Sequence, residues 1–238
     1  MARRKRFFLG GQPLHVIQRG NNRQAVFFAE ADYAQYIGWL AEAAREYGLA
    51  IHGYVLMTNH VHLLAAPADA DGLSRTMQSL GRRYVRYVNG RHGRTGTLWE
   101  GRFRAAPVDT DAYFFDCCRY IELNPVRARM VARVRDWRWS SYRAHALGAA
   151  DPLVSEHPLY RALGRTAAQR QAEYRLRFKR PADEEFVSAL RQGTNGGWPV
   201  GGDSFKREIA KALKCRVTPL PPGPKPQPPP DKRQMSLL

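Results

Sequence analysis

Two histidines separated by one residue form the sharpest chemical signal in the sequence. They lie in the segment Asn59-His60-Val61-His62-Leu63-Leu64, which reads as a β-strand. Because side chains alternate between the two faces of a strand, His60 and His62 project to the same side, about 7 Å apart along the chain. Two imidazoles placed in this way can converge on one divalent cation. A pair of polar residues on a solvent-facing strand has the same spacing, so the histidines alone indicate only a candidate metal site.

A tyrosine on a predicted helix is the second chemical signal. Tyr120 and Asn124 are four residues apart in Tyr-Ile-Glu-Leu-Asn-Pro, so they lie on one helical face. Phe114, Cys117 and Ile121 form the neighbouring apolar stripe, which places Tyr120 at the boundary between core and surface. A phenol at such a boundary can act as a nucleophile, although most boundary tyrosines only pack.

The charge balance indicates a polyanionic partner. The chain of 238 residues has 38 Lys and Arg against 21 Asp and Glu, a formal net charge of +17. Basic side chains release condensed counterions when they contact phosphates, so nucleic acid is the natural partner. No apolar run approaches the roughly 18 to 20 residues of a membrane span. The start of the chain reads as a basic arm and not as a signal peptide, so we expect a cytoplasmic protein with no membrane partner.

Strand and helix patterns alternate over the first half of the chain. The strand patterns cover residues 14–17, 49–57, 60–66 and 103–108, and the helix patterns cover residues 32–48, 73–90 and 109–124. Asp32 is predicted to cap the first helix together with Gln35, and Asn89-Gly90 is predicted to end the second. The first six elements give the split βαβ order of a ferredoxin-like sheet. We therefore predict an α+β fold with helices on one face, the histidine strand central in the sheet, and the third helix carrying Tyr120 toward the metal.

The remaining chain divides into two further zones. We predict a main domain over residues 10–145 and a helical extension over residues 146–216 that aids recognition of a DNA hairpin or serves only as a helical cap. Helices are expected over 169–180, 184–191 and 204–213, with turns over 193–198 and 200–202. Residues 217–238 are rich in proline and are predicted to form a disordered tail. The cysteines Cys117, Cys118 and Cys215 form no CxxC pair, so neither a zinc cluster nor a disulfide framework is expected.

Four sequence blocks in this order resemble one known family. They are QRGNNR at 18–23, GYVLMTNHVHLL at 53–64, LWEGRF at 98–103 and YIELNPVRA at 120–128. Together they are similar to the HUH single-tyrosine transposases of bacterial insertion sequences, and most of all to the REP-associated tyrosine transposases. The resemblance covers residues 10–145 approximately, and its specificity comes from the agreement of four blocks that are each weak alone.

The resemblance implies a role for each matching residue. His60 and His62 are expected to bind Mg²⁺ or Mn²⁺, and Tyr120 is expected to be the nucleophile. Asn124 falls where the family often supplies a third polar ligand, although some relatives carry Gln there. The implied reaction is metal-dependent cleavage of single-stranded DNA through a 5′-phosphotyrosine, at palindromic repeats that form hairpins. Relatives from insertion sequences act as dimers that share active sites, whereas the REP-associated branch is thought to act as a monomer, so monomer and homodimer both stay open.

DNA contacts are expected from arginines and an asparagine in three places. The second helix contributes four arginines interleaved with tyrosines, which suit phosphates and unstacked bases: Arg75, Arg82, Arg83 and Arg86. The family blocks contribute the other four residues: Arg19, Asn21, Arg23 and Arg102. Two other functions stay open. One is a replication initiator or relaxase, against which the Tyr-x-x-x-Asn-Pro block argues. The other is a transposase-derived DNA-binding regulator with little or no cleavage.

Overall fold

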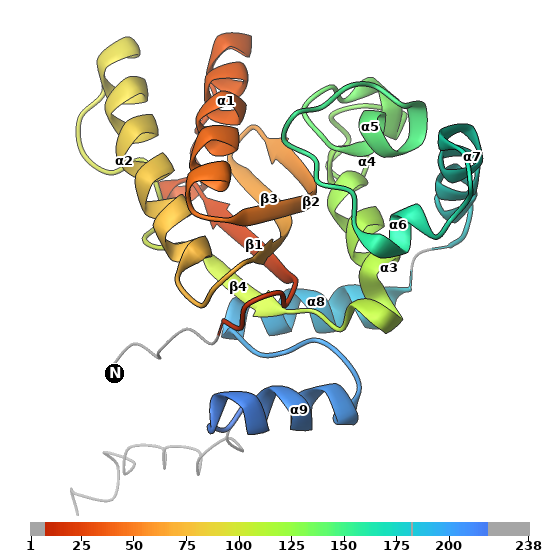
Figure 1. Ribbon diagram of the computed structural model, residues 1–238. Helices are drawn as coiled ribbons and strands as arrows, with labels where there is room; N and C mark the ends of the chain where they lie inside the picture. The colour runs from red at the N-terminus through yellow and green to blue at the C-terminus, as the bar shows by residue number, and fades with distance from the viewer. Residues whose placement is uncertain (1–7, 182, 219–238) are drawn as a thin grey trace, which may run out of the picture.

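A four-stranded antiparallel sheet forms the centre of the protein, which we describe from a computed structural model covering residues 8–181 and 183–218 (Figure 1). Its strands are β1 (Leu14–Arg19), β2 (Leu49–Met57), β3 (His60–Pro67) and β4 (Arg104–Pro107), in the spatial order β2-β3-β1-β4. Two residues, Thr58 and Asn59, join β2 to β3, as the sequence predicts for a hairpin. The histidine strand β3 is central, and the ferredoxin-like α+β fold is confirmed.

One face of the sheet is covered by the two long helices α1 (Glu30–Glu46) and α2 (Gly72–Arg91), which lie side by side (Figure 1). Alternate strand residues such as Val16, Val61 and Leu63 are fully buried in the core on this side. They meet the apolar stripes of the helices, which supply Tyr36, Leu40, Leu73, Leu80 and Tyr84. The period of two on the strands and of about four on the helices thus produces this half of the core.

The other face is covered by α3 (Thr110–Glu122) and by α8 (Glu184–Gly196) from the carboxy-terminal extension (Figure 1). Leu64 and Ala106 from the sheet share one buried cluster with Ile121 of α3 and Leu190 of α8. The extension therefore packs on the main domain and contributes to its second core. The extension also contains α6 (Pro158–Arg161), α7 (Ala167–Arg177) and α9 (Asp203–Leu213). Between α3 and these helices lie α4 (Asn124–Arg127), the 3₁₀ turn η2 (Val134–Asp136) and α5 (Tyr142–Leu147), and a second 3₁₀ turn, η1 (Asn21–Arg23), follows β1.

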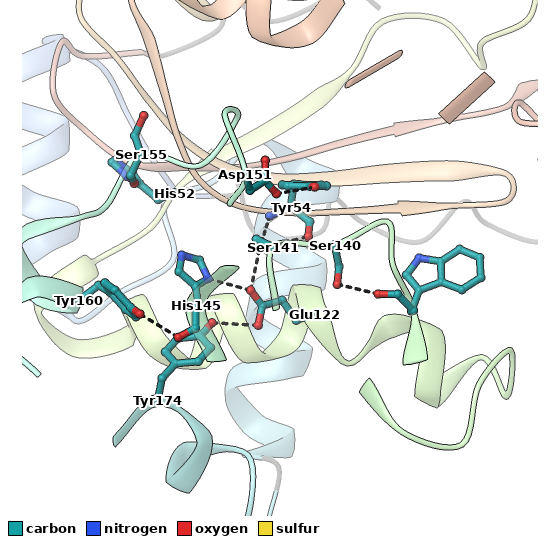
Figure 2. Close-up of polar contacts among 11 residues, drawn as sticks. His52, Tyr54, Glu122, Ser140, Ser141, His145, Asp151, Ser155, Tyr160 and Tyr174 are labelled. Carbon is teal, nitrogen blue, oxygen red and sulfur yellow. Dashed lines mark hydrogen bonds and ion pairs between the residues drawn. The ribbon is translucent and has the colours of Figure 1, made fainter. Parts of the chain in front are cut away.

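A buried polar network joins α3 to the extension, as Figure 2 shows. Glu122, near the end of α3, is 0% exposed. Its carboxylate accepts hydrogen bonds from the Ser141 hydroxyl (2.6 Å), from Nδ1 of His145 (3.0 Å) and from the Tyr174 hydroxyl (2.9 Å). The segment around α5, with Ser141 and His145, and the later helix that carries Tyr174 are therefore both fixed to the last turn of α3.

Three local predictions were wrong. Helix α1 begins at Glu30, and Asp32 accepts from the backbone N–H groups of Phe28 (2.8 Å) and Ala29 (2.9 Å) instead of capping with Gln35. Helix α2 runs through Asn89 and Gly90 to Arg91. Helix α8 runs through Gly193 to Gly196, where we predicted a turn. Gly193 does not end the helix; it allows the helix to pack closely, since a Cβ there would collide with the side chain of Val200.

The predicted end of α3 near Asn124 is confirmed, since α3 stops at Glu122 and Pro125 lies in the first turn of α4. The basic start at residues 1–7 and nearly all of the proline-rich tail, residues 219–238, lie outside the described residues. Among the helices of the described part, none combines the length and the apolar character required to cross a bilayer.

Candidate active site

The histidine pair lies on the face of the sheet that α3 and α8 cover. In the sheet register His60 pairs with Arg19 of β1 and His62 with Ile17. The two imidazole rings have centroids 5.0 Å apart. His60 is partly exposed at the end of the strand, and His62 is buried one step further in. The sequence prediction that both rings project to one side therefore agrees with the geometry.

The hydrogen bonds of His60 determine which ring nitrogen is free. Asn59 donates from Nδ2 to the backbone oxygen of Arg23 (2.9 Å), so its Oδ1 faces Nδ1 of His60 at 2.6 Å. An amide oxygen can only accept, so Nδ1 of His60 must carry the proton. Nε2 of His60 is then left with a lone pair, which is the form that binds a metal.

His62 lies in a fully buried histidine pair with His15 of β1. Nδ1 of His62 is 2.9 Å from Nε2 of His15, and the two rings stack at 5.1 Å between centroids. Burial lowers the pKa of His15 to about 3 and that of His60 to about 4, and it lowers the pKa of His62 well below its ordinary value. The three rings are therefore neutral at pH 7, as imidazole ligands must be.

Tyr120 meets this histidine cluster from α3. Its ring lies edge-on to His62 and to His15, at 5.7 Å and 5.6 Å between centroids, and the residue is only 5% exposed. Two guanidinium groups lie over the ring, Arg127 at 4.7 Å and Arg191 at 5.8 Å from its centroid. The structure thus brings His60, His62 and Tyr120 together beside two cationic groups that can stabilise negative charge.

Asn124 has a clear structural position. Its Nδ2 donates to the backbone oxygens of Tyr120 (2.9 Å) and Ile121 (3.1 Å) in the last turn of α3, where helix carbonyls need partners from outside the helix. The amide oxygen is not used in these two bonds. A role for Asn124 as a third metal ligand stays a prediction.

The donor set fits a divalent cation whose other ligands are oxygen atoms. Within the described ranges, no group of three or more His, Cys, Asp or Glu side chains is arranged to hold a metal ion. His60 and His62 would supply two neutral nitrogens, with water, phosphate or an amide oxygen completing the coordination. Such mixed sets are usual for Mn²⁺ and are accessible to Mg²⁺, which keeps several waters.

A basic groove lies between α2 and the segment that precedes β4. Its volume is about 930 Å³, and its lining combines guanidinium groups with apolar side chains: Arg75, Arg82, Arg86, Arg102, Met77, Val85, Trp99 and Phe103 among others. Arg75 is also paired with Asp69 at 2.6 Å. Arg83 lies elsewhere, because it pairs with Glu42 of α1 at 2.7 Å and stacks over Trp39 at 4.8 Å. The structure therefore brings three of the four predicted arginines of α2 to this groove.

The block LWEGRF extends the sheet beyond the short strand β4. Trp99 bridges to Gly20, and the backbone N–H of Glu100 donates to the oxygen of Arg19 at 2.8 Å. Arg102 lines the basic groove and also a small hollow with Arg19, Arg104 and Asn195 on the histidine side. This segment therefore connects the groove to the active-site face. Asn21 and Arg23 lie in η1, and Arg23 lines a hollow next to His60.

The chain matches one family model over this region. Residues 11–124 match the model described as "Transposase IS200 like". This segment, which contains His60, His62, Tyr120 and Asn124, matches the IS200-like transposase family, in agreement with the family predicted from the sequence blocks. No curated protein matches the chain.

The solved structures that are similar to this chain include the following two. One is a REP-associated tyrosine transposase bound to a REP hairpin, at 18% identity and a TM-score of 0.53, covering 66% of this chain and 93% of that chain. It supports the fold. The other is a protein of Deinococcus radiodurans described as a transposase, at 17% identity, covering 57% of this chain and 98% of that chain. Its TM-score is 0.36.

The sequence did not predict a role at the site for four residues: His15, Thr194, Arg127 and Arg191. His15 follows Leu14 on a strand and is 1% exposed, so alone it has the pattern of an ordinary core residue. Its contact with His62 depends on the register between β1 and β3, which no sequence pattern gives. Thr194 lies in the extension, where the predicted turn at 193–198 concealed the last part of helix α8. Arg191 ends the helix predicted over 184–191, and its place over Tyr120 depends on how α8 packs on the sheet, which no local pattern gives.

Proposed function

We propose that the protein is a metal-dependent single-stranded DNA endonuclease and strand transferase that cleaves through Tyr120. The observation that carries this proposal is the convergence of Tyr120 on His60 and His62 within one chain. The match to the IS200-like transposase family supports the same class of activity. The REP hairpin bound to the structurally similar transposase supports a hairpin-forming palindromic repeat as the substrate.

The chain's own groups account for the steps of this reaction. A divalent cation held by His60 and His62 would withdraw charge from the phosphate and so make it easier to attack. The phenol oxygen of Tyr120 loses its proton and forms a bond to phosphorus, while the bond from phosphorus to the DNA 3′-oxygen breaks and that oxygen takes up a proton. Arg127 and Arg191 stabilise the negative charge that develops beside the ring.

The product keeps the energy of the broken bond. The phosphotyrosine is a reactive ester, because a phenol is more acidic than an alcohol and leaves more readily. A second DNA 3′-hydroxyl can attack it, release Tyr120 and join the strands without ATP. Strand transfer and cleavage are thus the same chemistry run in opposite directions.

The basic groove is the proposed path for the single strand. Guanidinium groups of Arg82, Arg86 and Arg102 suit phosphates, and the partly exposed Val85 adds apolar surface for bases. Arg102 lines both the groove and the hollow that contains Arg19, and Arg19 pairs with His60 in the sheet register, so basic side chains lie between the groove and the histidine strand.

A denaturing gel with end-labelled hairpin DNA tests the proposal. Wild-type protein is incubated with Mg²⁺ or Mn²⁺ and a panel of single-stranded hairpins from palindromic repeats of the source genome. With a 3′ label, the labelled fragment should migrate as a protein adduct. With a 5′ label, it should appear as a free shorter strand ending in a 3′-hydroxyl.

The matched control is another tyrosine of the same helix. Tyr120→Phe should abolish the adduct, while Tyr113→Phe, which stacks on Phe186 away from the histidines, should retain it. Binding of the hairpins without any adduct would replace the nuclease proposal with the DNA-binding regulator. An adduct on the 5′-labelled fragment would show the opposite polarity of attack.

A further inference from the structure

A chain of three buried side chains connects helix α8 to the histidine pair. The Thr194 hydroxyl lies 2.7 Å from Nδ1 of His15, and Nε2 of His15 lies 2.9 Å from Nδ1 of His62. All three residues are 2% exposed or less. At such burial each polar atom needs its partner, so the three groups form one hydrogen-bonded unit.

This unit can be protonated in two ways. In one, His62 donates from Nδ1 to His15, and His15 donates from its own Nδ1 to the Thr194 oxygen. In the other, every bond is reversed, and the proton of His62 moves to Nε2. Only the first arrangement leaves Nε2 of His62 with a lone pair. His60 already has that form, because the oxygen of Asn59 holds its proton on Nδ1.

We propose that Thr194 and His15 are positioning residues that hold His62 with its Nε2 lone pair toward a divalent cation, so that helix α8 forms part of the metal site. This rests on the proposed function for the identity of the ligands. Partners of this kind fix the ring orientation of a metal-binding histidine and raise its basicity. The two ligands thus have separate anchors, Asn59 for His60 and the unit of His15 with Thr194 for His62.

The close approach of α8 gives this unit its geometry. Helix α8 packs on β4 and β1, and Gly193, next to Thr194, has no side chain to hold the helix away from Val200. Val200 in turn forms a bridge to Val108 just after β4. Thr194 is therefore held at a fixed depth over β1, where the hydroxyl meets His15.

The first test is Mn²⁺ binding to the full-length protein without DNA, followed by electron paramagnetic resonance of the free ion. Thr194→Val removes the hydroxyl at nearly constant shape and should weaken binding by about 10-fold or more. Thr194→Ser keeps the hydroxyl and should bind nearly as well as wild type. His15→Phe should weaken binding like Thr194→Val, and His15→Gln, whose amide oxygen can accept from His62, should recover part of it.

The second test is the tautomer of each histidine in the metal-free protein, read from ¹⁵N chemical shifts. His15, His60 and His62 should each carry the proton on Nδ1, which is the less common form of free histidine. In Thr194→Val the Nδ1–H form of His15 should be partly lost, while His60 should not change. Circular dichroism melting curves confirm that each variant compared is folded.

These readouts separate this proposal from the proposed function, because neither uses DNA. Equal Mn²⁺ affinity for wild type, Thr194→Val and His15→Phe would overturn the positioning role even if the adduct forms normally. A wild-type His62 with its proton on Nε2 would overturn it too. Conversely, the expected affinities and tautomers without any DNA adduct would support the positioning role and contradict the nuclease.

Discussion

At the level of single residues, the positive charge around Tyr120 has the most direct consequence for the proposed reaction. A phenol whose ordinary pKa is about 10 needs neighbouring positive charge to attack as an anion at neutral pH. The guanidinium of Arg127, at 4.7 Å from the ring centroid, comes from α4 immediately after the nucleophile's helix. Its position therefore depends on the junction between α3 and α4, where the Asn124 side chain donates to the backbone oxygen of Tyr120.

Replacing Arg127 tests this electrostatic role. Arg127→Ala should slow formation of the DNA adduct by about tenfold or more, because the developing negative charge loses one cationic neighbour. The rate of adduct formation is measured at saturating DNA, so that weaker binding does not contribute. Arg165→Ala, which removes an exposed arginine between α6 and α7, should leave the rate unchanged. Equal rates for wild type and Arg127→Ala would exclude the role.

Local sequence patterns account for part of the site. His60 and His62 share a face because of strand alternation, and Tyr120 with Asn124 shares one because of helical spacing. His15 and Thr194 are in contact although they are 179 positions apart, and no local pattern relates them. The proposed nucleophile and metal ligands were therefore predictable from the sequence, whereas the proposed positioning residues were not.

Among the elements, α3 is the one whose position matters most for the proposed reaction. Glu122 lies two residues after Tyr120, on another side of the same helix, and accepts hydrogen bonds from Ser141, His145 and Tyr174 (Figure 2). One side of α3 is thereby fixed to the extension while Tyr120 faces the histidines. The network therefore limits how the helix can rotate.

Removing the carboxylate should destabilise the protein strongly. Glu122→Ala leaves three buried donors without their acceptor, and we expect a loss of about 3 kcal/mol or more in the free energy of unfolding. Urea unfolding followed by tryptophan fluorescence measures this loss. Glu173→Ala, an exposed carboxylate on α7 next to Tyr174, is the matched control and should change the free energy by about 0.5 kcal/mol or less. A similarly small change for Glu122→Ala would contradict the network's importance.

Two of the three wrong element predictions concern glycines, which occur both in turns and where helices pack closely. Asn89-Gly90 and Gly193 were each interpreted as helix ends, because these residues favour turns. In the structure Asn89 donates to the oxygen of Gly96 at 3.0 Å while still helical, and Gly193 allows close packing on Val200. Whether a glycine serves a turn or a close approach depends on what packs against it, and that is a tertiary property.

For the whole molecule, the main point is that one chain holds all parts of the candidate site. His60, His62 and Tyr120 meet without a second copy, and both covering helices α3 and α8 belong to the same chain. A site shared between two subunits would instead need Tyr120 of one copy to reach the histidines of another. We therefore propose that one chain is sufficient for activity.

Mixing two inactive variants distinguishes these arrangements. His60→Ala and Tyr120→Phe should each fail to form the adduct, and an equimolar mixture should fail as well, because neither chain holds a complete site. A control mixture of wild type with Tyr120→Phe should give adduct in proportion to the wild-type protein. Recovery of adduct in the mixture of inactive variants would show that the site is assembled between subunits.

The net charge of +17 and the basic groove together predict how DNA affinity depends on salt concentration. Each phosphate contact on a single strand contributes about 0.7 to the slope of log affinity against log salt. Replacing Arg82 and Arg86 together by Gln should therefore reduce that slope by about 1.4. Arg83→Gln is the matched control from the same helix, because Arg83 pairs with Glu42, and it should leave the slope unchanged. Fluorescence anisotropy with a labelled oligonucleotide measures all three proteins.

The separation of His15 from Thr194 along the chain also sets the order in which they are synthesised. A ribosome releases β1, the histidine strand and Tyr120 well before it releases α8, since chains emerge from the amino terminus onward. If Thr194 supports the metal site as proposed, the nascent protein carries its nucleophile before its metal site reaches full affinity. A translation product that stops before α8 would hold the tyrosine yet bind the metal more weakly, and so threaten the genome that encodes it less than the full-length protein does.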